Sequence, residues 1–148
     1  MTLRVLFVCT GNSARSQIAE AILNAKGKGR IEATSAGSRP AERVNPYALA
    51  TLREFGIPWS GHAPRSVEGL EREHWDAVVT VCDRAKESCP IFPGQPMLAH
   101  WSIPDPAEVT GDDAAKRAAF RTAFVDLNRR IDLLLALPAL APRSPIVK

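Results

Sequence analysis

The chain has 148 residues with 45% hydrophobic and 24% charged side chains, a composition that excludes a disordered, collagen-like or coiled-coil protein. One domain is expected at this length, because two separate cores would leave each half too small. The formal net charge of +3 suits an anionic ligand, but no dense run of lysine and arginine points to a nucleic-acid partner.

Short apolar and β-branched runs alternate with segments in which apolar residues recur every three or four positions. The first pattern predicts buried strands and the second predicts amphipathic helices. In chain order they predict a strand over 3–8, a helix from Ser13 to Gly27, a strand over 31–35, a helix from Asn45 to Gly56, a short helix over 66–73, strands over 76–81 and 97–99, and a long helix from Asp113. This order favours an α/β fold, a four-stranded parallel sheet flanked by helices, whose ligand site lies at the carboxyl ends of the strands. The domain is expected to span residues 1–137, followed by a proline-rich C-terminal tail over residues 138–148.

The chain contains three cysteines, Cys9, Cys82 and Cys89, an odd number that cannot all be paired with one another. No stretch approaches the roughly 20 apolar residues that span a bilayer, and the short apolar start does not resemble a signal peptide. We therefore expect a cytoplasmic protein with no membrane partner, whose thiols are reduced and available for catalytic or redox chemistry.

The segment Cys9–Ser16 contains the most informative motif in the chain. A cysteine ends a predicted strand, and an arginine follows six residues later, where a helix is predicted to begin. Gly11 and Asn12 tolerate the left-handed conformations that a tight loop requires. Such a loop directs backbone N–H groups at one spot, where the helix dipole adds positive charge. We therefore expect an oxyanion-binding loop formed by Thr10, Gly11, Asn12, Ser13, Ala14, Arg15 and Ser16.

Within this loop, Arg15 can form two parallel hydrogen bonds with a bound oxyanion. The positive field at a helix N-terminus is expected to lower the pKa of Cys9, which makes Cys9 a thiolate nucleophile. The hydroxyl group of Ser16, and also that of Ser13, could donate to the sulfur, whereas Asn12 is expected to hold the loop's shape. The flanking strand and helix disfavour the alternative in which Cys9 is only a small apolar core residue.

This arrangement resembles the active-site loop of the low-molecular-weight tyrosine phosphatase superfamily, which includes the thiol-linked arsenate reductases. The resemblance implies a phosphatase-like fold in which Cys9 attacks phosphorus or arsenic while the loop amides and Arg15 hold the oxyanion. It also implies that Asp105, which stands between Pro104 and Pro106, protonates the leaving oxygen.

The other two cysteines favour the reductase. Cys82 ends the predicted strand that lies beside the first strand in such a sheet, so its thiol could face Cys9 and attack the arsenic-bound sulfur. Attack by Cys89 on Cys82 would then move the disulfide to the surface and restore Cys9. Seven helical residues rise about 10 Å, whereas disulfide Cα atoms lie within roughly 4.4–6.8 Å, so the segment from Asp83 to Cys89 must change its local order.

The resemblance extends over about residues 3–135, and the motifs that carry it are Cys82-Asp83, Cys89-Pro90, Pro93-Gly94, His100-Trp101 and Asp105-Pro106. It implies a three-cysteine arsenate reductase in which Cys9, Cys82 and Cys89 are the nucleophile and the first and second resolving thiols. The expected ligands are arsenate and phosphate-like oxyanions. The implied electron donor is thioredoxin, or alternatively glutaredoxin with glutathione or another low-molecular-weight thiol. We expect a monomer without a cofactor.

One departure from the family concerns potassium. Some thioredoxin-linked members bind this ion through residues that match Asn12, Glu20 and Ser35, together with a threonine and an aspartate from a later segment. The matching segment here, Gly61–Ser66, contains no carboxylate. We therefore expect Arg65 to supply the positive charge instead, pairing with Glu20 or with the surroundings of the loop.

Three alternatives remain open. A low-molecular-weight phosphatase would use Cys9, Arg15 and Asp105 alike, although Ala107 stands where those phosphatases usually present an aromatic residue. A non-catalytic oxyanion sensor would use the same loop. A metal site would involve Cys82 and Cys89, with His100 and Cys9 as further ligands, but the two cysteines are farther apart than zinc motifs usually place them.

Overall fold

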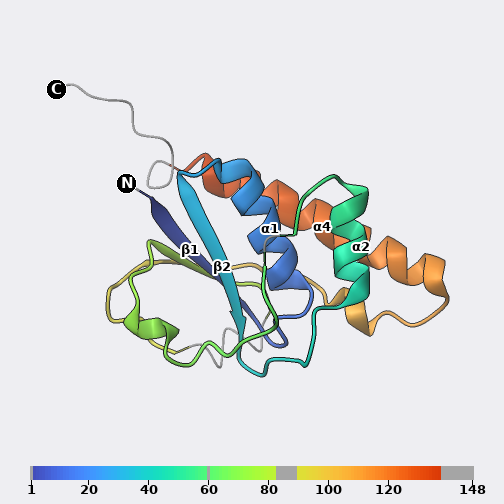
Figure 1. The fold of residues 1–148 in the computed structure, drawn as a ribbon, viewed down its shortest axis with the longest axis horizontal. Coiled ribbons are helices and arrows are strands. Elements are labelled where there is room, and N and C mark those ends of the chain that lie inside the picture. Colours follow the sequence, from blue (N-terminus) through green and yellow to red (C-terminus); the bar gives the residue numbers. More distant parts are fainter. Residues whose placement is uncertain (1, 60, 83–89, 138–148) are drawn as a thin grey trace.

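The computed structural model describes residues 2–59, 61–82 and 90–137. Strands and helices alternate through the first two strands and the first two helices, and short 3₁₀ turns precede the third strand and the last helix (Figure 1). The elements are β1 (Leu3–Cys9), α1 (Arg15–Gly27), β2 (Ile31–Gly37), α2 (Pro46–Glu54), η1 (Leu70–Arg72), β3 (Ala77–Thr80), β4 (Met97–His100), η2 (Pro106–Glu108) and α4 (Asp113–Leu135). None of the helices described here is long and apolar enough to cross a membrane.

The strands form one parallel sheet in the order β2-β1-β3-β4. Strand β1 is therefore flanked on both sides, with Cys9 opposite Gly37 of β2 and Val8 opposite Thr80 of β3. Because all strands run in the same direction, their carboxyl ends meet at one edge of the sheet. The predicted four-stranded parallel α/β fold is confirmed, and the end of β1 is the point where a ligand site is expected.

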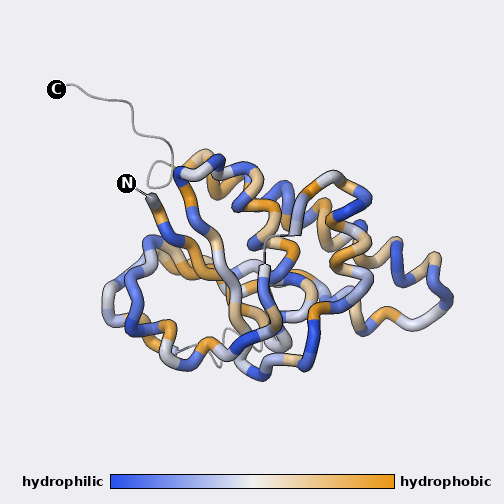
Figure 2. The backbone as a smooth tube through the Cα atoms, viewed as in Figure 1, coloured by the Kyte–Doolittle hydropathy of each residue, from blue (hydrophilic) through white to orange (hydrophobic). Residues whose placement is uncertain are grey.

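The core lies between the sheet and the three helices, which pack against one another beside β1 and β2 (Figure 1). Residues Val5, Leu6, Phe7 and Val8 of β1 are fully buried, in keeping with a strand covered on both faces. Helix α4 contributes its apolar face, formed by Phe120, Phe124, Leu127, Ile131 and Leu134. Figure 2 shows these apolar strands and the hydrophilic residues that recur along the outer side of α4.

Side chains cap the N-termini of α2 and α4. Asn45 caps α2 by accepting a hydrogen bond from the Tyr47 amide at 2.8 Å, and Pro46 takes the first helical position. Helix α4 begins in the same way, since the side chain of Asp112 accepts a hydrogen bond from the Ala115 amide at 2.9 Å.

Two predicted elements differ from the structure. The short helix predicted over 66–73 is wrong apart from the 3₁₀ turn η1, because Ser66 forms a bridge with Gly37 at the end of β2 and Gly69 adopts a φ of 89°. Helix α1 begins at Arg15 rather than Ser13, because residues 10–14 form the loop that follows β1. The predicted tail over 138–148 and the segment 83–89 lie outside the described residues.

Candidate active site

The loop of residues 10–14 turns the chain from the end of β1 into the N-terminus of α1. Of the two residues expected to allow left-handed geometry, Asn12 uses it, with a φ of 52°. Gly37 of β2 packs directly beneath the loop, and a Cβ atom there would lie 2.5 Å from the carbonyl oxygen of Thr10. The loop therefore depends on a glycine in a neighbouring strand, and nothing in the local sequence pattern signals this requirement.

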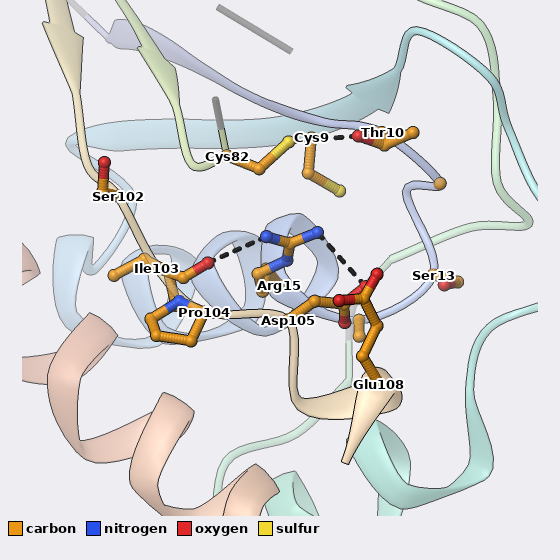
Figure 3. Close-up of a pocket in the computed structure, with 12 residues that line it drawn as sticks. Cys9, Thr10, Ser13, Arg15, Cys82, Ser102, Ile103, Pro104, Asp105 and Glu108 are labelled. Carbon is orange, nitrogen blue, oxygen red and sulfur yellow. Dashed lines mark hydrogen bonds and ion pairs between the residues drawn. The ribbon is translucent and has the colours of Figure 1, made fainter. Parts of the chain in front are cut away.

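A cavity of about 530 Å³ opens above the loop at the carboxyl ends of the strands (Figure 3). Its lining comes from the loop, from the end of β3 and from the segment before and within η2, and consists of Cys9, Thr10, Gly11, Ser13, Ala14, Arg15, Cys82, Ser102, Ile103, Pro104, Asp105 and Glu108. Most of the predicted site residues therefore share one cavity. Asn12 and Ser16 are fully buried beside the loop and act on it through hydrogen bonds.

Cys9 is only 2% exposed. Its Sγ atom lies 2.8 Å from Ser16 Oγ and accepts a hydrogen bond from the Asn12 amide at 3.2 Å. Burial raises the pKa of the Cys9 thiol above its ordinary value, although hydrogen bonds from Ser16, the charge of Arg15 and the Asn12 amide act in the opposite direction. The expected low pKa of Cys9 is therefore corrected, because desolvation of the thiolate is the largest effect at this depth. Ser16, rather than Ser13, is the side chain against the sulfur.

A buried chain of hydrogen bonds sets the direction in which Ser16 donates. The side-chain amide of Asn12 donates to Ser16 Oγ at 2.8 Å and to Ser35 Oγ at 2.9 Å, and Ser35 donates in turn to Glu20 Oε1 at 2.7 Å. Since Ser16 Oγ already accepts from Asn12, its own hydrogen is available for Cys9. The chain from Glu20 to Ser16 thus presents a hydroxyl donor to the sulfur, and this stabilises the thiolate form of Cys9.

Glu20 lies at the far end of this chain and is 2% exposed. Burial raises the pKa of Glu20, while the hydrogen bond from Ser35 and the positive charges of His62 and Arg65 lower it. The basic side chain against this carboxyl group is His62, whose Nε2 atom is buried 3.4 Å from Glu20 Oε1. His62 Nδ1 donates to the Ala63 carbonyl at 2.6 Å, so a second proton on the ring would face Glu20.

The expectation for Arg65 holds only in part. Its guanidinium group donates to the Ser35 carbonyl at 3.2 Å and to Thr34 Oγ1 at 2.5 Å, and it reaches Glu20 through its charge rather than by direct contact. Its backbone amide donates to Asn12 Oδ1 at 3.0 Å, which fixes the orientation of that side-chain amide. The side chain that lies directly against Glu20 is instead His62.

Arg15 and Asp105 meet across the cavity. Arg15 is 8% exposed, and its guanidinium group donates to the Ile103 carbonyl at 2.8 Å and lies 3.5 Å from Asp105 Oδ2 (Figure 3). Asp105 also caps η2, because its side chain accepts a hydrogen bond from the Ala107 amide at 2.9 Å. The Asp-Pro segment is therefore held against the oxyanion loop, with a carboxyl group beside the guanidinium group.

Cys82 comes to the same cavity because β3 pairs with β1, and the Val81 amide continues this pairing by donating to the Val8 carbonyl at 2.9 Å. Cys82 is 6% exposed, and its Sγ atom lies 3.1 Å from Thr10 Oγ1. Figure 3 shows its side chain directed toward Cys9. The third predicted thiol, Cys89, lies outside the described residues, as does the predicted order change between positions 83 and 89.

Cys89, one of the ligands in the metal-site alternative, lies outside the described residues. Among the side chains that the structure does describe, no group of three His, Cys, Asp or Glu residues could hold a metal ion. His100 instead pairs with Thr80, whose Oγ1 atom lies 2.7 Å from His100 Nδ1.

Comparison with known proteins agrees with this geometry. The chain is 35% identical over 127 residues to an arsenate reductase of Halalkalibacterium halodurans, which covers 86% of this chain and 91% of the relative. It is 32% identical over 133 residues to a glutaredoxin arsenate reductase of a Synechocystis species, with 90% and 96% covered. Among solved structures, an arsenate reductase in the oxidized state matches with a TM-score of 0.76 at 31% identity, covering 90% of this chain and 96% of the other.

A low molecular weight protein tyrosine phosphatase from T. tengcongensis matches with a TM-score of 0.74 at 28% identity, covering 90% of this chain and 98% of the other. The family model described as low molecular weight phosphotyrosine protein phosphatase matches residues 4–140. The expected resemblance is therefore confirmed, and the chain belongs to the low molecular weight phosphotyrosine protein phosphatase family.

Proposed function

We propose that this chain is an arsenate reductase that uses its cysteines in sequence. The observation that carries the proposal is that two cysteines, Cys9 and Cys82, line one cavity together with Arg15. Hydrolysis of a phosphate ester needs only one cysteine, because water completes the reaction, whereas a two-electron reduction needs a second thiol. The similarity to relatives named arsenate reductases, at 35% and 32% identity over most of the chain, supports the same reaction.

In the first step, the loop amides and Arg15 hold arsenate while Cys9 Sγ attacks the arsenic atom. One arsenic–oxygen bond breaks, and the hydroxyl group of HAsO₄²⁻ leaves as water after it receives the proton that Cys9 gives up. Asp105 relays this proton, since its carboxyl group lies beside Arg15 at the cavity wall.

In the second step, Cys82 attacks the sulfur of Cys9. A Cys9–Cys82 disulfide forms, the sulfur–arsenic bond breaks, and its electron pair stays on arsenic, which is thereby reduced from arsenate to arsenite. The proton of Cys82 goes to the departing oxyanion. Thr10 Oγ1 supports this step from 3.1 Å, where it can stabilise the attacking Cys82 sulfur.

In the third step, Cys89 attacks Cys82, so that a Cys82–Cys89 disulfide forms and Cys9 regains its proton. An external dithiol then reduces this disulfide. Thioredoxin is the proposed donor, and a solved thioredoxin-dependent arsenate reductase of Corynebacterium glutamicum matches with a TM-score of 0.64 at 29% identity. Glutaredoxin with glutathione, or another low-molecular-weight thiol, is the alternative electron donor. We also propose that the protein is a monomer and that it works in the reducing cytoplasm.

The test is arsenite release by the purified protein with thioredoxin, thioredoxin reductase and NADPH, compared among the wild type and the three single Cys→Ser variants. Repeated turnover should be lost in each variant. Hydrolysis of a small aryl phosphate should be lost in Cys9→Ser and retained in Cys82→Ser and Cys89→Ser, so the latter two variants report on the relay rather than on folding. Wild-type arsenate turnover by Cys82→Ser would overturn the proposal.

A phosphatase is the second candidate, and one observation favours it. Cys9, Arg15 and Asp105 line the same cavity, and they are the three groups that hydrolysis through a phosphorylated cysteine needs. Under this reading neither Cys82→Ser nor Cys89→Ser changes any activity of the protein, and no arsenite forms. The same set of variants therefore separates the two functions.

A further inference from the structure

The mouth of the oxyanion cavity has a carboxylate that the proposed reaction does not use. Glu108 lines the cavity together with Asp105, and Figure 3 shows its side chain rising from η2 toward the Asp105 carboxylate. Its backbone is well anchored, because the Glu108 amide donates to the Asp105 carbonyl at 3.2 Å and the preceding Pro106 is buried. The position of Glu108 relative to the loop is thus set by the fold.

The cavity has its positive charge inside and a negative charge at its outer edge. Arg15 lies inside, where it is held by the Ile103 carbonyl and by Asp105, whereas Glu108 is exposed at the outer edge. Among the described residues that line the cavity, Arg15 is the only cation and none is aromatic. The outer part of the site therefore offers an organic group a negative charge and no flat apolar surface to pack against.

A free oxyanion and a phosphate ester differ in whether part of the bound ligand extends past Glu108 at the mouth of the cavity. Arsenate or phosphate is small enough to lie wholly within the loop, so nothing needs to pass Glu108 once it is bound. The organic group of a phosphate ester must project out past Glu108, where a ring would remove water from the carboxylate and a second negative charge would be repelled.

We propose that Glu108 is a specificity-determining residue that reserves the site for free inorganic oxyanions and disfavours phosphate esters, most strongly those with an anionic organic group. The inference rests on the proposed function only in taking the loop as the oxyanion site. It concerns binding, so it does not depend on the order in which the three cysteines react.

The experiment measures how well three probes protect Cys9 from alkylation by iodoacetamide, with the modified Cys9 peptide quantified by mass spectrometry. The probes are inorganic phosphate, phenylphosphonate and 4-carboxyphenylphosphonate, of which the last two differ by one negative charge at the mouth. The quantity compared is the ratio of the two phosphonate dissociation constants in each protein. This ratio cancels any effect of a substitution on the phosphonate group itself or on the fraction of folded protein.

In Glu108→Gln, the penalty against the carboxylated probe should fall about threefold, as expected for removing one of two unit charges about 7 Å apart in water. In Glu108→Lys it should fall about sevenfold, since the sign of the charge is reversed. Both differences should shrink in about 1 M salt, where charges are screened over roughly 3 Å. The control Glu68→Gln removes an exposed carboxylate that does not line the cavity and should leave the ratio unchanged.

Equal ratios in the wild type, Glu108→Gln and Glu108→Lys would overturn the inference. It would also be overturned if neither phosphonate protected Cys9 in any of these proteins while inorganic phosphate did, because exclusion of esters would then lie elsewhere. If inorganic phosphate itself failed to protect Cys9, the proposed oxyanion site would be wrong as well, so the two failures are distinguishable.

Discussion

Replacing Ser16 by alanine tests the hydrogen-bond chain that ends at Cys9. The Ser16 hydroxyl lies 2.8 Å from Cys9 Sγ, and both side chains are buried. Because Ser16 Oγ accepts from Asn12, its hydrogen points to the sulfur, and the hydroxyl stabilises the thiolate more than the thiol. Ser16→Ala should therefore raise the pKa of Cys9 further above its ordinary value.

A hydrogen bond to a charged group contributes about 1.5–3 kcal/mol, which corresponds to a roughly tenfold to hundredfold lower thiolate fraction at a pH below the Cys9 pKa. The assay is the pH dependence of the Cys9 alkylation rate by iodoacetamide, read by mass spectrometry of the Cys9 peptide. The rate at neutral pH should fall by that factor, while the plateau at high pH should change little.

Alanine at position 16 also leaves the Asn12 side-chain amide with one acceptor fewer, which should cost about 1–3 kcal/mol of unfolding free energy. Urea unfolding measures this loss separately from reactivity, so a folded variant can be compared with the wild type at equal pH. Identical alkylation profiles for the folded variant and the wild type would refute the reasoning, because Ser16 would then not be donating to the sulfur.

Three further predictions concern other parts of the site. Arg15→Lys should weaken protection of Cys9 by inorganic phosphate about tenfold or more in the alkylation assay, because lysine cannot form two parallel hydrogen bonds; unchanged protection would contradict the role of the guanidinium group. Gly37→Ala should destabilise the fold by about 1–3 kcal/mol in urea unfolding and weaken phosphate protection, because its Cβ atom would lie 2.5 Å from the Thr10 carbonyl oxygen. Burial raises the pKa of Glu20, so the folded state binds its proton more tightly than the unfolded state, and the stability contributed by this group is lost as pH rises above its ordinary value of 4.5 through the raised pKa. Glu20→Gln should remove that decline, so its unfolding free energy relative to wild type should increase with pH; a pH-independent difference would count against a raised pKa.

Much of the fold could be predicted from local patterns. The alternation of apolar runs indicated the four parallel strands, and Asn45-Pro46 indicated the start of α2, because capping and proline geometry act within a few residues. The same locality misled the prediction for residues 66–73, where a bridge between Ser66 and Gly37 competes with helix formation. A contact between residues so far apart in the sequence leaves no local pattern.

In the candidate site, too, the features that depend on local sequence were predictable and those that depend on tertiary packing were not. The spacing of Cys9 and Arg15 between a strand and a helix was enough to indicate an oxyanion loop, because backbone N–H groups converge wherever a tight turn meets a helix N-terminus. The contact of His62 with Glu20 and the direction of the Cys9 pKa shift were not predictable from spacing. Both depend on how deeply the groups are buried and on which segments pack over them.

By itself, the sequence determined which chemistry is available: a cysteine at the end of a buried strand, an arginine at the following helix N-terminus and two further thiols. Only the tertiary structure decided that Cys82 and Asp105 share the cavity with Cys9, and that Glu108 stands at its mouth. The physical reason is that strand pairing and loop packing join residues about 70 to 100 positions apart, whereas side-chain periodicity and turn preferences act over only a few residues.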